Sequence, residues 1–226
     1  MKLNTAEVAA LRPDYLGFIF WEPSSRFFDG EIPELPEGVQ KVGVFVDASI
    51  DEILSKVEKY RLHAVQLHGK ETPEFCKRLQ IKSKKLNVRS SLPRRQAGAV
   101  ETSLTKTNLK IIKVFSIKDN FDFNLLKPYE EVCDYYLFDT KGKLPGGNGY
   151  AFDWIVLENY SSAKPYFLSG GIGLEDTEAI KEFRQRPESE YCHAIDVNSK
   201  FEIEPGLKNL DELNDLIKKT NSTKFV

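Results

Sequence analysis

Short runs of almost continuously apolar residues alternate with helical patterns along most of this 226-residue chain. A run that is apolar at nearly every position suits a parallel strand covered on both faces, whereas a half-exposed strand would alternate. Strand alternating with helix indicates βα units joined by right-handed crossovers. The seven strand candidates are Tyr15–Phe20, Val42–Val46, Ala64–Leu67, Ile111–Ile117, Tyr135–Asp139, Tyr166–Gly171 and Ala194–Val197.

Helical patterns precede the first strand candidate and follow most of the others. They cover Thr5–Leu11, Ile50–Tyr60, Thr72–Leu79, Phe152–Asn159, Asp176–Arg184 and Leu210–Lys219. A chain that opens on a helix and then carries seven βα steps predicts a TIM (β/α)8-type barrel without its first strand. A doubly wound open sheet is the alternative, although no G-x-G-x-x-G follows an early strand.

One segment interrupts this rhythm. Lys82–Asn108 holds seven Lys or Arg residues and a single acid, Glu101, and it shows no clear periodicity. We expect a basic inserted surface loop at about 82–108 within one domain that spans residues 1–226. Because no aromatic residues interleave the charges, the segment does not indicate a nucleic-acid tail.

The composition further limits the class of protein to which the chain can belong. The chain is 41% hydrophobic and 29% charged, which suits one α/β core, and its net charge of −2 gives no reason to expect nucleic acid or a membrane surface as a partner. No apolar run approaches the length of a membrane span, and no signal-peptide pattern opens the sequence. Three cysteines without C-x-x-C spacing indicate a reducing, cytoplasmic setting, and the three scattered histidines do not indicate a metal site.

The strand ends carry the polar residues of interest. Asp139 ends an aromatic-rich run and is followed by Gly146-Gly147-Asn148-Gly149, so it stands where an α/β barrel keeps its acid–base chemistry. Arg26 follows the first run, where its guanidinium could grip a carboxylate or phosphate. Gln66 lies inside an apolar run and must either orient a neighbour or face a ligand. The simpler interpretations are a turn cap for Asp139, a surface position for Arg26 and, as the favoured reading of His68, a structural cap.

The last two strand ends resemble an anion site. Ser169-Gly170-Gly171-Ile172 frees backbone N–H groups for close approach to an anion, and Asp196-Val197-Asn198-Ser199 follows the next run. These are the strand ends at which barrels build phosphate sites. An internal polar pair at the barrel top is the alternative for Asp196.

Taken in order, these pieces resemble the phosphoribosylanthranilate isomerase family of tryptophan biosynthesis over nearly the whole chain. The matching segments are Gly17-Phe18-Ile19-Phe20 with Ser24-Ser25-Arg26-Phe27, Gln66-Leu67-His68-Gly69, Phe138-Asp139-Thr140, Gly146-Gly147-Asn148-Gly149 with Phe152-Asp153-Trp154, Ser169-Gly170-Gly171-Ile172, and Asp196-Val197-Asn198-Ser199 with Glu202 and Pro205-Gly206-Leu207-Lys208.

The resemblance implies a TIM barrel that converts N-(5-phosphoribosyl)anthranilate to 1-(2-carboxyphenylamino)-1-deoxyribulose 5-phosphate by an Amadori rearrangement. It implies no cofactor and no metal, and we expect a monomer or homodimer. Asp139 matches the general acid that protonates the ring oxygen. Arg26 matches the residue that holds the anthranilate carboxylate, and Asp196 the one near the anthranilate nitrogen. Gln66 and His68 match substrate-side positions, and the phosphate-binding positions are Gly170, Gly171, Asn198 and Ser199.

The chain departs from the family at its beginning. The family opens on a strand that ends in Lys-x-Cys-Gly and supplies a cysteine general base, whereas this sequence opens at Met1-Lys2-Leu3-Asn4. We expect the sequence to be truncated, with an in-frame Lys-x-Cys-Gly encoded upstream. A phosphate-binding pseudoenzyme without a base is the second hypothesis. A third is a relative of indole-glycerol-phosphate synthase, for which Lys113 would be the catalytic lysine.

Overall fold

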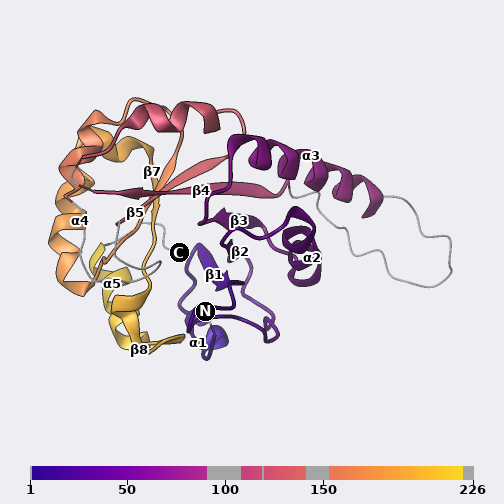
Figure 1. Ribbon diagram of the computed structural model, residues 1–226. Helices are drawn as coiled ribbons and strands as arrows, with labels where there is room; N and C mark the ends of the chain where they lie inside the picture. Colours follow the sequence, from indigo (N-terminus) through magenta and orange to yellow (C-terminus); the bar gives the residue numbers. More distant parts are fainter. Residues whose placement is uncertain (1, 91–107, 119, 141–152, 221–226) are drawn as a thin grey trace.

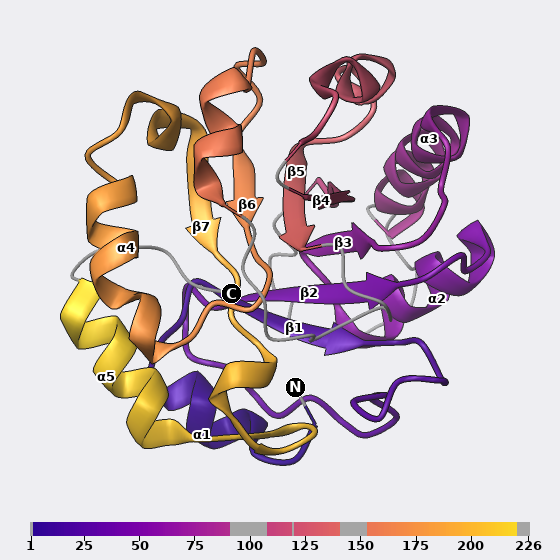
Figure 2. The same ribbon diagram turned by 60° about the vertical axis from the view of Figure 1, so that its left-hand side comes forward.

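A computed structural model describes residues 2–90, 108–118, 120–140 and 153–220. Seven parallel strands form one sheet in strict sequence order, β1-β2-β3-β4-β5-β6-β7. Figure 2 shows this sheet curled, with helices on its outer side. The strands are β1 (Tyr15–Ile19), β2 (Gln40–Phe45), β3 (Ala64–Leu67), β4 (Lys110–Ile117), β5 (Tyr135–Thr140), β6 (Tyr166–Leu168) and β7 (Cys192–Ile195).

The seven predicted strands are confirmed, and the order excludes the doubly wound alternative, which needs a reversal of strand order. Within the described residues, β1 and β7 form the two edges of the sheet. Tyr15 and His193 connect these edges at one end, because the Tyr15 hydroxyl and His193 Nε2 share a hydrogen bond of 2.7 Å. The curl therefore brings the first and last strands together, as in a barrel.

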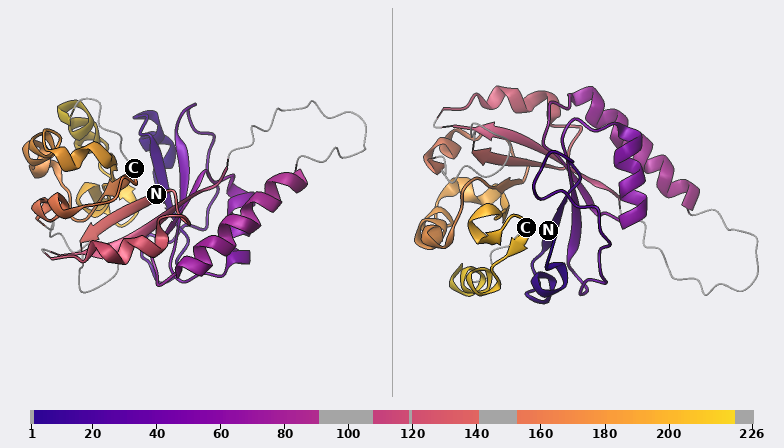
Figure 3. Two further views of the ribbon diagram at one scale, coloured as in Figure 1. Left: turned by 90° about the horizontal axis from the view of Figure 1, so that it is seen from above. Right: turned by 60° about the horizontal axis from the view of Figure 1, so that its bottom comes forward.

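Helices cover the outer face of the sheet, and Figures 1 and 3 place α2 and α3 toward one end of the curl and α4 and α5 toward the other. The α-helices are α1 (Thr5–Ala10), α2 (Ile50–Tyr60), α3 (Pro73–Ser90), α4 (Thr177–Phe183) and α5 (Leu210–Thr220). The 3-10 helices are η1 (Phe123–Tyr129), η2 (Trp154–Asn159), η3 (Leu174–Asp176), η4 (Pro187–Tyr191) and η5 (Ser199–Phe201). A hairpin of β8 (Glu202–Glu204) and β9 (Leu207–Lys208) precedes α5.

The helix α2 illustrates how the sequence encodes these elements. The Ser49 side chain accepts a hydrogen bond from the Glu52 backbone N–H at 3.2 Å, which caps the helix start. Ile53 and Leu54 are buried on its inner side, and Arg61 ends it in the left-handed conformation. An apolar stripe of this kind packs a helix against a sheet.

Apolar side chains on both faces of the strands explain their continuous hydrophobicity. An inner cluster is formed by Tyr15, Val42, Ala64, Ile112, Val114, Leu137, Phe167 and Ala194. Strand residues of the opposite parity, such as Phe18, Val65 and Phe138, belong to the larger core under the helices. Successive strand side chains point to opposite faces, so this parity tells which residues face the inside of the curl.

Several elements differ from their predicted bounds, and two of the differences lie near the carboxyl ends of the strands or in the connection between them. The strand β6 ends at Leu168 rather than Gly171, because Gly170 and Gly171 take positive φ values of 96° and 68° that a strand does not use. The helix expected at Phe152–Asn159 is a 3-10 helix that begins at Trp154. Phe152 and Gly146-Gly147-Asn148-Gly149 lie outside the described residues.

The prediction of a basic loop is wrong for residues 82–90. Residues 82–90 continue the helix α3, since Lys, Arg and Leu all favour helix and Lys82 pairs with Asp51 of α2 at 2.8 Å. Residues 91–107 lie outside the described residues. No helix of the described part of the chain is long and apolar enough to cross a membrane.

Candidate active site

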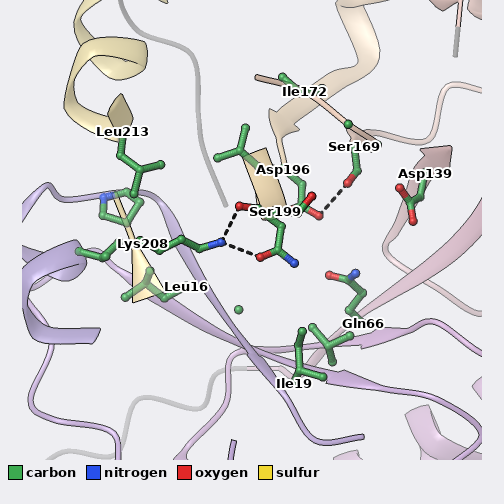
Figure 4. A pocket seen from close by; sticks show the side chains of 18 of the residues that line it. Leu16, Ile19, Gln66, Asp139, Ser169, Ile172, Asp196, Ser199, Lys208 and Leu213 are labelled. Atoms are coloured by element: carbon green, nitrogen blue, oxygen red, sulfur yellow. Dashed lines mark hydrogen bonds between the residues drawn. The ribbon is translucent and has the colours of Figure 1, made fainter. Parts of the chain in front are cut away.

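A cavity of about 160 Å³ opens at the carboxyl ends of the strands. It is lined by polar residues from the exits of β3, β5, β6 and β7, and by apolar residues from α1, β1 and α5, as Figure 4 shows in part. The polar side chains share the parity of the inner cluster: Gln66, Asp139, Ser169 and Asp196 each lie two residues beyond Ala64, Leu137, Phe167 and Ala194. Because side chains two residues apart on a strand point to the same face, all four side chains reach the cavity.

Asp139 and His68 meet across β4, which lies between their strands. The distance from His68 Nε2 to Asp139 Oδ2 is 3.3 Å, and both side chains are largely buried, with 21% and 17% of their surface exposed. His68 is held by its backbone N–H, which donates to the Phe45 carbonyl at 2.8 Å. Both predicted residues line the cavity.

Asp196 and Ser169 form a second pair beside them. The Ser169 hydroxyl donates to Asp196 Oδ2 at 3.0 Å, and the Asp196 backbone N–H donates to Leu168 at 2.8 Å. Burial raises the pKa of Asp196 to about 6, and the negative charge of Asp139 adds to the effect. The polar pair that we considered as an alternative is therefore present, and it belongs to the cavity wall.

Gln66 is buried, with 6% of its surface exposed, and it lines the cavity. Its parity places the side chain on the inner face of β3, and Figure 4 shows it beside Ile19. No hydrogen bond joins its amide to another described residue. A buried amide calls for a partner, so the cavity side is where Gln66 can bind a ligand.

The four predicted phosphate-binding residues, Gly170, Gly171, Asn198 and Ser199, all line the cavity. Gly170 is required by its surroundings: a Cβ there would lie 2.2 Å from Thr140 Oγ1 and 2.4 Å from Thr140 N. This close approach packs the loop after β6 directly against the end of β5. The glycines bring backbone N–H groups to the cavity edge, which suits an anion.

Arg26 does not line the cavity, but its guanidinium forms an ion pair with Glu202 of the β8–β9 hairpin. Its Nε and Nη2 atoms lie 2.7 Å and 2.6 Å from Glu202 Oε2. Its side chain is 17% exposed, so it is partly buried rather than fully exposed at the surface. The ion pair leaves other N–H groups of the guanidinium for a ligand carboxylate.

Two functional candidates, Glu202 and Lys208, were not selected from the sequence as site residues. They face each other across the β8–β9 hairpin, with Lys208 Nζ 3.1 Å from Glu202 Oε1. The sequence does indicate a turn here, because Pro205-Gly206 is a pair typical of turns. In the structure Gly206 takes a φ of 91° and reverses the direction of the chain. Lys208 lines the cavity.

Lys113 lies outside the cavity. Its parity is opposite to that of Ile112 and Val114 of the inner cluster. Its Nζ donates to the carbonyls of Leu67 and Gly69 at 3.1 Å and 2.8 Å, and to Glu71 Oε2 at 3.0 Å. All three donors of the ammonium are used, so the structure does not favour a catalytic role for Lys113.

The three cysteines also lie away from the cavity lining. Burial raises the pKa of Cys76 to about 11 and the pKa values of Cys133 and Cys192 to about 12. Such thiols are inert near neutral pH, so none of them supplies a thiolate at this site. Among the described residues, no group of three or more His, Cys, Asp and Glu is placed to hold a metal ion.

A curled parallel sheet with paired carboxyls and glycine loops at its carboxyl ends defines a barrel-type enzyme for a small anionic substrate. The family model described as N-(5'phosphoribosyl)anthranilate (PRA) isomerase matches residues 2–98 and 94–219. The chain therefore belongs to the phosphoribosylanthranilate isomerase family.

Named relatives agree with this membership. The N-(5'-phosphoribosyl)anthranilate isomerase of Parabacteroides distasonis is 39% identical over 221 residues, which cover 95% of this chain and 86% of the relative. That of Phocaeicola vulgatus is 37% identical over 206 residues, covering 91% and 86%.

Solved structures support the fold. Phosphoribosyl anthranilate isomerase from Thermotoga maritima has 28% identity and a TM-score of 0.68, covering 95% of this chain and 91% of that protein. A phosphoribosyl anthranilate isomerase in complex with reduced 1-(o-carboxyphenylamino)-1-deoxyribulose 5-phosphate has 26% identity and a TM-score of 0.64, covering 95% and 90%. The predicted TIM-barrel class is confirmed.

Proposed function

We propose that this chain acts in tryptophan biosynthesis, converting N-(5-phosphoribosyl)anthranilate to 1-(2-carboxyphenylamino)-1-deoxyribulose 5-phosphate. The observation that carries the proposal is that one cavity holds the Asp139–His68 pair together with the glycine and Asn198 loops. A phosphosugar with an acid-labile ring needs both an anion site and a positioned acid. Family membership favours this isomerase over the binding-only alternative.

In the proposed reaction, Asp139 donates a proton to the furanose ring oxygen, the ring opens and a Schiff base forms at C1. A base then removes the C2 proton, and the resulting enolamine becomes the ketone product. We assign to Asp196, which has a pKa of about 6, the exchange of a proton with the anthranilate nitrogen. Gly170, Gly171, Asn198 and Ser199 hold the phosphate, and Arg26 holds the carboxylate.

The C2 proton needs a base that the three cysteines do not provide. The test is to measure conversion of substrate to product by two proteins: the chain as given, and the chain extended at its N-terminus by a strand ending in Lys-x-Cys-Gly. We expect the extended protein to turn over, and Asp139→Asn in it to lower kcat by about 10²–10⁴-fold while reduced product still binds.

Two comparisons complete that experiment. Arg26→Ala should mainly raise KM, because it removes a binding contact, and the exposed Asp51→Asn should change neither constant. Binding of reduced product without turnover by either protein would support the pseudoenzyme instead. Equal, small effects of the Asp139 and Arg26 variants would contradict the roles assigned to them.

We further infer a small-molecule substrate as the only partner class, a cytoplasmic location, and a monomer or homodimer. The net charge of −2 and three unpaired cysteines support the first two inferences. Sedimentation of the purified protein distinguishes the monomer from the dimer.

A further inference from the structure

The carboxylate of Glu202 joins two parts of the site. Its side chain is 4% exposed. Its Oε2 atom accepts from Arg26 Nε at 2.7 Å and forms an ion pair with Arg26 Nη2 at 2.6 Å. Its Oε1 atom accepts from Lys208 Nζ and the Gly206 backbone N–H, both at 3.1 Å. Burial alone would raise the pKa of Glu202, but the Arg26 hydrogen bond and the Lys208 charge outweigh it and lower that pKa. Glu202 is therefore an anion that holds two cations in place.

The ammonium of Lys208 is saturated by its neighbours. Besides Glu202 Oε1, it donates to the Asn198 backbone carbonyl at 2.8 Å and to Asn198 Oδ1 at 2.6 Å. An ammonium has three donors and no acceptor, so Lys208 has no further N–H group for a ligand. Although Lys208 lines the cavity, it can affect a bound anion by hydrogen bonding only through Asn198, and its charge adds a through-space attraction.

Lys208 also determines which way the Asn198 amide points. Because an ammonium cannot accept a hydrogen bond, the amide oxygen of Asn198 faces Lys208 and the amide nitrogen faces away from it. Asn198 itself is exposed, so its side chain has no other restraint of comparable strength among the described residues. Figure 4 shows the two contacts of Lys208 at the cavity wall.

Arg26 keeps N–H donors that Glu202 does not engage. A guanidinium has five N–H groups, and Glu202 Oε2 engages one on Nε and one on Nη2. The remaining groups on Nη1 and Nη2 form the end of the fork that binds a carboxylate through two parallel hydrogen bonds. Glu202 thus restricts the orientation of the Arg26 side chain but leaves these N–H groups on Nη1 and Nη2 available to a ligand carboxylate.

We propose that Glu202 and Lys208 are positioning residues for the two anionic ends of the substrate. Lys208 turns the Asn198 amide so that its N–H groups serve the phosphate, and Glu202 orients both Lys208 and Arg26, which serves the carboxylate. The inference rests on the proposed function, because it takes the phosphate and carboxylate as the groups recognised.

The test compares two ligands: reduced product, and the same molecule without its 5-phosphate. For Lys208→Met we expect affinity for reduced product to fall about tenfold or more, the loss typical of a charge-supported hydrogen bond, with affinity for the dephosphorylated ligand unchanged. For Glu202→Gln we expect affinity for both ligands to fall, because it also loosens Arg26. Lys110→Met removes a lysine that pairs with Asp134 at the opposite end of the sheet, and it should change neither affinity.

A structural role alone would give a different pattern. The double variant Lys208→Met/Glu202→Gln removes the buried ammonium and the buried carboxylate together, so thermal stability should recover part of what Lys208→Met loses, while Arg26 is left without its carboxylate. We expect phosphate discrimination to stay lost, since nothing turns Asn198. The inference would be overturned if the double variant recovered its discrimination between the two ligands together with its stability. It would also be overturned if Lys208→Met lost affinity equally for both ligands. Failure of the wild-type protein to bind either ligand would instead overturn the proposed function.

Discussion

Two aspartates at neighbouring positions in one cavity have different environments. Asp139 contacts His68, whereas Asp196 accepts a hydrogen bond from the neutral Ser169 hydroxyl. Burial and the charge of Asp139 raise the pKa of Asp196 to about 6.

Ionisation of Asp196 should cost the folded protein stability. Its folded pKa of about 6 lies above the model value of 3.8, so the folded state binds more protons than the unfolded state between these values, and stability falls as pH rises through that window. We expect Asp196→Asn to be more stable than wild type by about 1–3 kcal/mol above pH 6, with the difference shrinking toward pH 4. Urea unfolding at pH 4 and pH 8 measures it; a difference independent of pH would contradict the account.

The residues of the site differ in how far the sequence could predict them. Asp139, Gln66 and Asp196 were predictable, because strand parity and a polar residue at an apolar strand exit depend on local sequence alone. The pairing of Arg26 with Glu202 was not, since 176 positions separate them and only the curl of the sheet brings them together.

At the scale of single elements, the loop after β6 depends on Gly170. We expect Gly170→Ala to destabilise the protein by about 2–4 kcal/mol, because the new Cβ would meet the Thr140 backbone N at 2.4 Å and the φ of 96° disfavours any side chain. Gly38→Ala is the matched control: its φ is 95°, but nothing lies within 4 Å, so it should cost only about 1 kcal/mol. Thermal or urea unfolding compares them, and equal costs would mean that contact with Thr140 is not limiting.

The connection from β3 to α3 is held by a buried ion pair. Lys113 Nζ contacts Glu71 Oε2, and Glu71 also accepts from the backbone N–H groups of Asp47 and Gly69. We expect Lys113→Met to cost about 3–5 kcal/mol, because it leaves a buried carboxylate without its cation. Adding Glu71→Gln should recover much of that loss, and kcat of the folded variants should stay near wild type. Loss of turnover at unchanged stability would revive a catalytic role for Lys113.

Helix type was harder to predict than strand position. The crossovers from β4 to β5 and from β5 to β6 contain the 3-10 helices η1 and η2 in their described parts. Both begin at an aspartate whose side chain accepts a hydrogen bond from the backbone two residues on, a turn that competes with a regular helix. Apolar periodicity over six or seven residues cannot separate these outcomes.

For the whole molecule, we propose one domain over residues 1–226. The larger core under the helices is one continuous cluster that includes Val8 and Leu16 near the start of the chain and Leu213 and Leu216 near its end. A hydrogen bond between Tyr15 and His193 connects the two edges of the sheet. We expect one cooperative unfolding transition. Far-UV circular dichroism and fluorescence of Trp21 and Trp154 should give the same midpoint in urea; separate midpoints would indicate two folding units.

The most direct test of the account is a crystal structure of this protein with reduced 1-(o-carboxyphenylamino)-1-deoxyribulose 5-phosphate, the ligand of the solved relative. The account predicts its phosphate against the Gly170–Gly171 backbone and the Asn198 amide, its carboxylate on Arg26, and its sugar between Asp139 and Asp196. Binding of the phosphate elsewhere, or of the whole ligand outside this cavity, would contradict the assignment of the site.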